Sequence, residues 1–366
     1  MEDKISRESL LTIKDSLLRA REMVSEIYGR VNSSFRLTTV DYEVSDKILT
    51  ELLNPMYEIE AKLDEAERAI RLKYRVYPGL VGEPLVYETA IVLEEELPKK
   101  LSDDIIIWPG ARDSCIILHV PHDSRIIPRS VSDNFLIDST ALEKELDLMT
   151  DTCTTKLAVE GARRSRVIPY VFLNQLSRLV FDPERFPDER EEMNSVGMGA
   201  VYEKTSSGTT LRAKDEAYES MIIEKFYKPY AQSFEELVET IYKKHGKVII
   251  IDVHSYRKEI GSNELNGGLE RPELCIGTDE YHTPALLNET AREAFADLGT
   301  IIENQPFSGT YVPLKYYKNN DKIQSIMLEF RDDCLVTESL DIANKLYSAR
   351  EMLTNFINTL VVKLYS

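Results

Sequence analysis

One apolar run constrains the fold of this chain more than any other feature. Residues 247–256 read Lys-Val-Ile-Ile-Ile-Asp-Val-His-Ser-Tyr, and the run is apolar without alternation, which is typical of a strand covered on both faces in a mostly parallel sheet. In open α/β sheets the ligand crevice lies beyond the carboxyl ends of the strands, where His254 falls. Asp252 and His254 share a face because successive side chains of a strand alternate. The run predicts an α/β fold in which His254 is either a packed core residue or a ligand.

A second segment, residues 114–125, also runs from an apolar strand into a polar turn. It contains His119 and His122, two of the five histidines, and Pro121 ends the strand so that His122 lies on the loop bordering the crevice. Imidazole and carboxylate are the usual zinc ligands where cysteine is absent, and a catalytic zinc keeps three protein ligands and an open position. We predict that His122 and His254 bind a metal, with a carboxylate or His119 as the third ligand.

A helix is expected from Thr140, because Thr140 and Glu143 have the spacing of a capping box. Asp147 and Asp151 stand four residues apart on one face of this helix, where like charges repel slightly unless a cation or solvent compensates. Spacing alone favours a solvated acidic face for these two aspartates. The apolar stripe of the helix consists of Leu142, Leu146, Met149, Cys153 and Leu157.

A late strand, residues 325–331, carries a candidate base. Ile326, Leu328 and Phe330 occupy one face, whereas Glu329 and Arg331 share the other. Burying a carboxylate is costly unless it is paired or used. Glu329 is therefore either half of a Glu-Arg pair on an edge strand or a general base beside zinc-activated water.

Seven ordered segments together resemble the N-formylglutamate amidohydrolase family, from about residue 112 to about residue 335. They are His119-Val-Pro-His122, Met149-Thr-Asp151 with Thr155 following, Leu176-Ser-Arg178-Leu-Val-Phe-Asp182-Pro, Asp252-Val-His254-Ser, Ile276-Gly-Thr278-Asp279, Asn304-Gln-Pro-Phe-Ser-Gly309-Thr-Tyr311 and Leu328-Glu329.

The family is similar in architecture to the zinc carboxypeptidases and related deacylases. The resemblance implies a three-layer α/β fold of the phosphorylase/hydrolase-like kind, with a mixed, mostly parallel sheet. It implies His122, Asp151 and His254 as ligands of one zinc ion and Glu329 as the base that activates water. His119 then becomes a residue that orients His122.

Further residues of the matched segments are expected at the substrate: Arg178, Asp182, Thr278, Asn304 and Tyr311. The guanidinium of Arg178 suits a carboxylate or a developing oxyanion, because its fork donates two parallel hydrogen bonds. The chain departs from the family after Asp182, where it reads Asp-Pro-Glu-Arg-Phe-Pro and enzymes acting on formylglutamate commonly read Asp-Leu-Asn-Arg-Pro. The Asn-Arg pair is absent in register, although Arg185 is near. Amide hydrolysis is thus a firmer expectation than formylglutamate.

Composition narrows the class of protein. The chain has 366 residues, 43% of them hydrophobic, and a net charge of -18, which disfavours nucleic acid and anionic membranes as partners because phosphate binding needs clustered Lys and Arg. The sequence has no apolar run of membrane-spanning length and no signal-peptide pattern, so we expect a cytoplasmic protein. The four cysteines form no Cys-x-x-Cys pair and are expected as buried free thiols.

The first part of the chain has a different pattern. Residues 10–31 and 49–70 carry apolar positions at alternating spacings of three and four, which predicts an antiparallel helical hairpin with a kink at Pro55. We place this hairpin at residues 1–78 and the catalytic domain at 79–366. The hairpin either covers one side of the catalytic domain or mediates docking or homo-oligomer formation. A packed terminal helix is expected at residues 341–364.

These observations predict a zinc-dependent amidohydrolase that removes an N-acyl group, N-formyl included, from an acidic amino acid such as glutamate. The expected partner is the small-molecule N-acyl amino acid. Two alternatives remain open: a carboxypeptidase-like hydrolase of peptides or cell-wall fragments, and a binding protein that kept the fold and lost turnover. Metal content separates the last from the others, because a binding protein needs no stoichiometric zinc.

Overall fold

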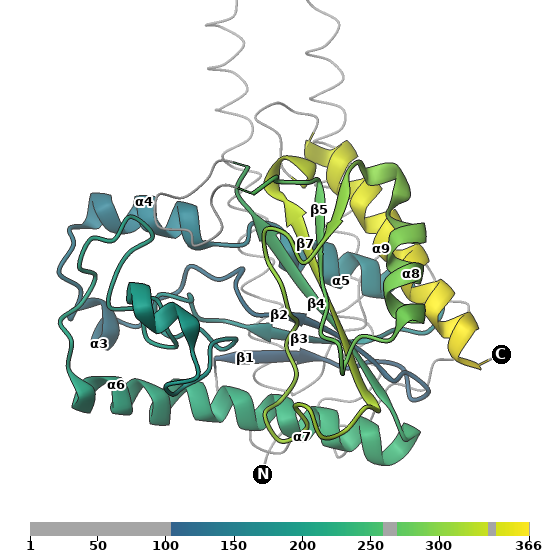
Figure 1. Ribbon diagram of the computed structural model, residues 1–366, viewed down its shortest axis with the longest axis horizontal. Coiled ribbons are helices and arrows are strands. Elements are labelled where there is room, and N and C mark those ends of the chain that lie inside the picture. The colour runs from purple at the N-terminus through teal and green to yellow at the C-terminus, as the bar shows by residue number, and fades with distance from the viewer. Residues whose placement is uncertain (1–103, 259–268, 336–341, 366) are drawn as a thin grey trace, which may run out of the picture. The chain divides into compact units, whose positions relative to one another are not determined.

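The computed structural model describes residues 104–258, 269–335 and 342–365 (Figure 1). The predicted hairpin at 1–78 and the domain boundary near residue 78 lie outside these ranges. No helix in the described ranges is long and apolar enough to cross a membrane.

One mixed sheet of seven strands forms the centre of the fold. Its order is β1 (Ile105–Trp108), β3 (Tyr170–Asn174), β2 (Ile116–Val120), β4 (Val248–Tyr256), β7 (Ile323–Arg331), β5 (Leu274–Gly277) and β6 (Ile301–Glu303). Strands β3, β2, β4 and β7 are parallel, whereas β1 and β5 pair antiparallel with β3 and β7, and β6 is parallel to β5. The two predicted apolar runs are the neighbouring strands β4 and β2, and every residue of both is buried.

Helices cover both faces of this sheet (Figure 1). They are α3 (Arg129–Ser132), α4 (Ser139–Met149), α5 (Thr154–Arg164), α6 (Glu216–Ile222), α7 (Lys228–His245), α8 (Ala285–Ala294) and α9 (Ile342–Tyr365), with a π-helical turn at Ile223–Tyr227. Helix α7 packs on the face of His119, whose ring centroid lies 4.7 Å from that of Phe234. The opposite face carries Phe330, which packs on Phe295 just after α8, and Phe295 in turn contacts Phe356 of α9. The α/β class and the terminal helix are therefore confirmed.

The segment predicted as one helix from Thr140 through Leu157 is two helices, and this prediction was wrong. Helix α4 ends at Met149, and α5 begins only after Cys153, whose backbone is left-handed with φ of 69°. The predicted cap was also wrong, because Asp138, and not Thr140, accepts a hydrogen bond from the first turn of α4. Asp151 therefore does not share a helical face with Asp147.

The break is stabilised from outside the helices. The Asp151 amide donates to the His122 carbonyl at 3.1 Å, and the Asp123 carboxylate accepts from the Thr155 amide at 2.7 Å. Cys153 makes no side-chain cap, so Asp123 supplies the acceptor that the first turn of α5 needs. Tertiary hydrogen bonds thus overrule the apolar periodicity and leave Asp151 beside the loop of His122.

Candidate active site

Strand register places four polar side chains on one face of the sheet. His119 of β2 lies opposite Asp252 of β4, and His254 of β4 lies opposite Glu329 of β7. Because side chains two residues apart share a face, all four point to the side covered by α7. Polar groups of this kind are rare in strands this apolar, and here they collect at the carboxyl half of the parallel strands.

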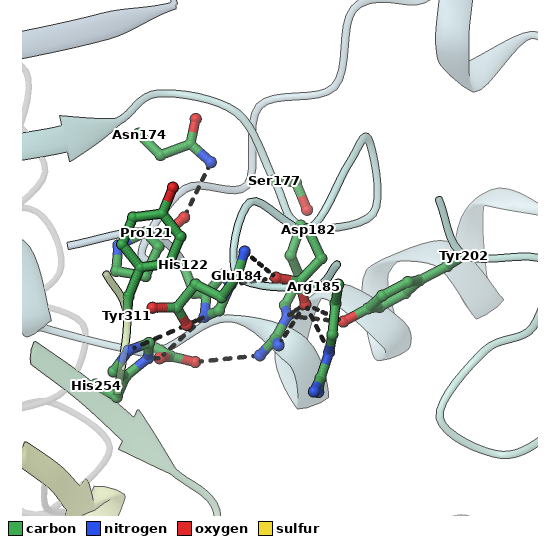
Figure 2. A network of polar contacts seen from close by, with 12 residues as sticks. Pro121, His122, Asn174, Ser177, Asp182, Glu184, Arg185, Tyr202, His254 and Tyr311 are labelled. Carbon is green, nitrogen blue, oxygen red and sulfur yellow. Dashed lines mark hydrogen bonds and ion pairs between the residues drawn. The ribbon is translucent and has the colours of Figure 1, made fainter. Parts of the chain in front are cut away.

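The loop after β2 is fixed by the neighbouring strand. Pro121 follows β2, and its carbonyl accepts a hydrogen bond from the Asn174 side chain at the end of β3, 2.9 Å away (Figure 2). This contact and the hydrogen bond from the Asp151 amide hold His122 over the ends of the strands. His122 and His254 are both 2% exposed, with ring centroids 5.2 Å apart.

Each of these two imidazoles is hydrogen-bonded through one nitrogen only. Asp182 Oδ1 accepts from His122 Nε2 at 2.9 Å, and Asp151 Oδ2 accepts from His254 Nδ1 at 2.9 Å. The other nitrogens, His122 Nδ1 and His254 Nε2, are buried without a hydrogen-bond partner in the described ranges. A metal-binding histidine typically has its second ring nitrogen held by a carboxylate in this way.

The electrostatics of the cluster favour a positive charge between the histidines. Although burial opposes the shift, Glu184 and Asp252 raise the pKa of His254 well above its ordinary value. Likewise, hydrogen bonds from the two histidines hold the pKa of Asp151 below its usual range against the effect of burial. His122, Asp151 and His254 each offer a ligand atom within 4.8 Å of the others. The residues present therefore fit a divalent cation.

Asp182 is the centre of the charge network on the other side of His122 (Figure 2). It is fully buried, and its Oδ2 accepts from Arg178 Nη2 at 2.7 Å and from the Tyr202 hydroxyl at 2.6 Å. Its oxygens are thus occupied by His122, Arg178 and Tyr202. The contacts describe a residue that holds other site residues, and its predicted contact with substrate stays a prediction.

Arg178 also has most of its donors in use. Its Nε donates to Asp182 and to the Tyr202 hydroxyl at 3.2 and 3.0 Å, whereas Nη1 lies 3.8 Å from Asp151 Oδ1. The two-pronged face predicted for the substrate is therefore directed at Asp182. Only the Nη1 edge is turned toward Asp151 and the two histidines.

Glu329 does not form the Glu-Arg pair with Arg331 that was one of its two predicted roles. Arg331 instead contacts Asp333 and Glu273 at 2.7 and 2.5 Å. Glu329 Oε2 is buried without a hydrogen-bond partner in the described ranges. Burial, together with the charges of nearby carboxylates, raises the pKa of Glu329 to about 8. A carboxyl group in this state can exchange a proton near neutral pH.

His119 is fully buried, and both of its ring nitrogens are bound. Its Nδ1 is 2.7 Å from Asp252 Oδ1, and its Nε2 is hydrogen-bonded to the Tyr230 hydroxyl. Tyr311 stacks on the ring at 4.8 Å between centroids, and its amide donates to Asp252 Oδ2 at 3.2 Å. Both His119 nitrogens are therefore in use, and the residue is best placed to support Asp252.

The predicted residues Thr278 and Asn304 bind each other. The Thr278 amide donates to the Asn304 side chain at 2.8 Å, and the Asn304 amide group donates to the Thr278 hydroxyl at 2.7 Å. Thr278 also donates to Glu303 at 3.0 Å. No contact in the described ranges joins either residue to the two histidines, so their substrate-binding role stays a prediction.

Two site residues were missed by the sequence reasoning. Glu184 Oε2 lies 3.2 Å from His254 Nε2 and 3.7 Å from His122 Nδ1. Arg185 lies 3.7 Å from Asp182 Oδ2, and its Nε is buried without a hydrogen-bond partner in the described ranges. Counted from Asp182, they stand at the Asn and Arg positions of Asp-Leu-Asn-Arg-Pro, so the expectation that the pair is absent in register was wrong for Arg185. Their places in this family segment were the feature of the sequence that could have identified both residues.

An α/β protein with a buried His-Asp-His cluster suited to a divalent cation is the class that fold and site define. The chain belongs to the N-formylglutamate amidohydrolase family, whose sequence model matches residues 114–336. It is thus a member of a family of hydrolases acting on amide bonds. No curated protein matches the chain.

Two solved structures share the fold. One, titled N-formylglutamate amidohydrolase, is from Ralstonia eutropha JMP134 and is 14% identical, with a TM-score of 0.58 over 73% of this chain and 98% of its own. The other is a gene product of Agrobacterium tumefaciens, 16% identical, with a TM-score of 0.55 over 75% of this chain and 99% of its own. At these identities the likeness concerns the fold alone.

Proposed function

We propose that this protein is a metal-dependent amidohydrolase that removes an N-acyl group, N-formyl included, from an acidic amino acid. The observation that carries the proposal is that His122 Nδ1, His254 Nε2 and Glu329 Oε2 are all buried without a hydrogen-bond partner among the described residues. Family membership supports the amide bond as the target.

The proposed metal centre comprises His122, Asp151 and His254. When bound there, a divalent cation such as zinc supplies a Lewis acid that polarises the acyl oxygen and lowers the pKa of water to about 7. Asp182 and Asp151 hold the two imidazoles in place through their second nitrogens. These carboxylates fix which nitrogen of each ring is free to bind.

Glu329 is the proposed general base. Its Oε2, which is buried without a hydrogen-bond partner in the described ranges, would take the proton from attacking water and return it to the leaving nitrogen. Its place opposite His254 in the β4–β7 register sets the carboxyl group beside the proposed metal centre.

Two arginines would bind the anionic groups of the substrate. Arg178 Nη1 faces the cluster and is proposed to donate to the oxyanion, since the rest of its fork is held by Asp182 and Tyr202. Arg185, whose side chain is 32% exposed, is proposed to pair with a substrate carboxylate. Its Nε, which lacks a hydrogen-bond partner among the described residues, supports this assignment.

The test is metal analysis of the purified protein combined with hydrolysis assays across a panel of N-acyl amino acids and their amides. We expect one bound divalent cation, hydrolysis of the acids well above that of the amides, and loss of both metal and activity in His254→Ala. Glu329→Gln should keep the metal and lower turnover about a hundredfold or more. A protein without stoichiometric metal under permissive conditions would refute metal-dependent catalysis. Equal rates for acids and amides would favour the carboxypeptidase-like alternative.

A further inference from the structure

Among the described residues, Glu184 is the one carboxylate that lies within 4 Å of both open histidine nitrogens. Its Oε2 lies 3.2 Å from His254 Nε2 and 3.7 Å from His122 Nδ1. Asp151 Oδ2 also lies 3.7 Å from His122 Nδ1, but it is bound to the opposite nitrogen of His254 and accepts from the Ser255 amide at 3.3 Å. Asp151 thus approaches His254 from the side that faces away from the open nitrogen.

The distances around Glu184 match those of ligands that share one ion. Zinc binds nitrogen and oxygen at about 2.0–2.2 Å in tetrahedral geometry, which separates its ligand atoms by about 3.4 Å. The separations of 3.2 and 3.7 Å between Glu184 Oε2 and the open nitrogens bracket this value.

Other groups near His254 Nε2 are already engaged. Asp252 Oδ1 is 3.1 Å from this nitrogen but only 2.7 Å from His119 Nδ1, and its Oδ2 accepts from the Tyr311 amide. Glu184 differs, because its Oε1 is a buried oxygen without a hydrogen-bond partner in the described part of the chain. This oxygen makes one longer contact, 3.7 Å from His119 Nδ1, so the carboxylate is less engaged than those of Asp151 and Asp252.

We propose that Glu184 is a protein ligand of the metal centre, together with His122 Nδ1 and His254 Nε2, and that Asp151 acts by positioning His254. The inference rests on the proposed metal-dependent function and revises its metal centre, because Glu184 takes the place of Asp151 as the third protein ligand. Three protein ligands leave the fourth position of a tetrahedral site open for water. Because Glu184 stands at the Asn position of the family pattern, the additional carboxylate distinguishes this chain from enzymes that keep Asn there.

The experiment compares full-length variants by competition with a chelator, using Zn²⁺ and Co²⁺. Glu184→Gln should weaken Zn²⁺ binding about a hundredfold or more, beyond the tenfold to hundredfold loss typical of residues that only position a ligand, which is the range expected for Asp151→Asn. Glu145→Gln, which changes a buried glutamate that is bound to Ser206, is the matched control and should bind as the wild type does.

A nearby charge could strengthen binding without ligation, so two measurements separate these effects. The visible absorption of bound Co²⁺ reports its ligands and should change in Glu184→Gln but keep its shape in Asp151→Asn. Glu184→Asp keeps the charge and withdraws the carboxylate, so it should also lose affinity. The unfolding midpoint of metal-free Glu184→Gln should equal or exceed that of the wild type, because the substitution removes one of several neighbouring carboxylates.

Each outcome decides a different point. Wild-type affinity and an unchanged Co²⁺ spectrum in Glu184→Gln would overturn the role of Glu184 while the proposed function stands. Wild-type affinity in Glu184→Asp would show a purely electrostatic effect and would also overturn it. A wild-type protein that binds no divalent cation would overturn the ligand role and the proposed function together.

Discussion

Replacing Arg178 by methionine should destabilise the protein more than removing the Tyr202 hydroxyl, which binds the same aspartate. The guanidinium lies 2.7 Å from Asp182 Oδ2, and their side chains are 15% and 0% exposed. At this separation the attraction is about 6 kcal/mol for an effective dielectric constant of about 20. Desolvation offsets part of it, so breaking such a buried pair costs about 3–5 kcal/mol. Tyr202→Phe removes a hydrogen bond to the same oxygen and should cost about 1.5–3 kcal/mol.

The assay is urea unfolding of metal-free protein, followed by circular dichroism at several pH values. Although burial opposes it, Arg178 and His122 hold the pKa of Asp182 well below its usual range. A depressed carboxyl pKa gives stability that is present above the unfolded value of about 3.9 and is lost as pH falls through the folded value. In Arg178→Met the guanidinium is gone, so burial raises the pKa of Asp182. In acid Asp182 becomes protonated, and a neutral carboxyl group loses nothing when the guanidinium is absent.

The difference between wild type and Arg178→Met should therefore be largest at neutral pH and shrink in acid. Two results would refute the reasoning: a loss for Arg178→Met smaller than that for Tyr202→Phe, or a difference that stays constant as the pH is lowered. The first would show that Asp182 does not depend on the guanidinium, and the second that its charge is not the cause.

Three further predictions concern stability and can be measured by the same unfolding assay. Asp138→Ala should cost about 1 kcal/mol because it removes the cap of α4, whereas Thr140→Ala should cost clearly less, and the reverse order would restore the capping box. Gly277→Ala should cost about 1–3 kcal/mol, since a Cβ there would lie 2.2 Å from the Gly309 carbonyl oxygen; an unchanged midpoint would contradict that close approach. Leu118→Ala should cost about 2–5 kcal/mol because the side chain is fully buried in the central sheet, and a loss below about 1 kcal/mol would show that the core is not packed as described.

The central strands were predictable because their signal is local. The strand pattern can be read within residues 247–256 and within residues 325–331 alone. Strands β4 and β7 have nearly the same bounds as these predicted strands. The antiparallel addition of β5 and β6 beyond β7 was not predicted. These strands are three and four residues long, too short to carry a pattern of their own.

The site shows the same division between local and tertiary information. His254 and Glu329 come from periodic strands, so their common face could be read from spacing. Asp151 could not be placed by spacing, because a hydrogen bond to the His122 carbonyl ends the helical periodicity. Glu184 lies outside any strand or helix, where no period applies; its place in the segment after Asp182 was the only signal in the sequence, and its contacts with both histidines show where it lies.

The capping of α5 by Asp123 connects the loop of His122 to the C-terminal helix. Helix α5 packs closely on α9: the Thr354 hydroxyl donates to the Gly161 carbonyl at 3.4 Å, and Arg350 lies 3.2 Å from Glu160. Hydrogen bonds and packing therefore join three segments in sequence: the loop that carries His122, helix α5 and the C-terminal helix α9. Truncation of α9 would release α5 and, through Asp123, loosen the histidine loop, so that the position of His122 would depend on the packing of the C-terminal helix.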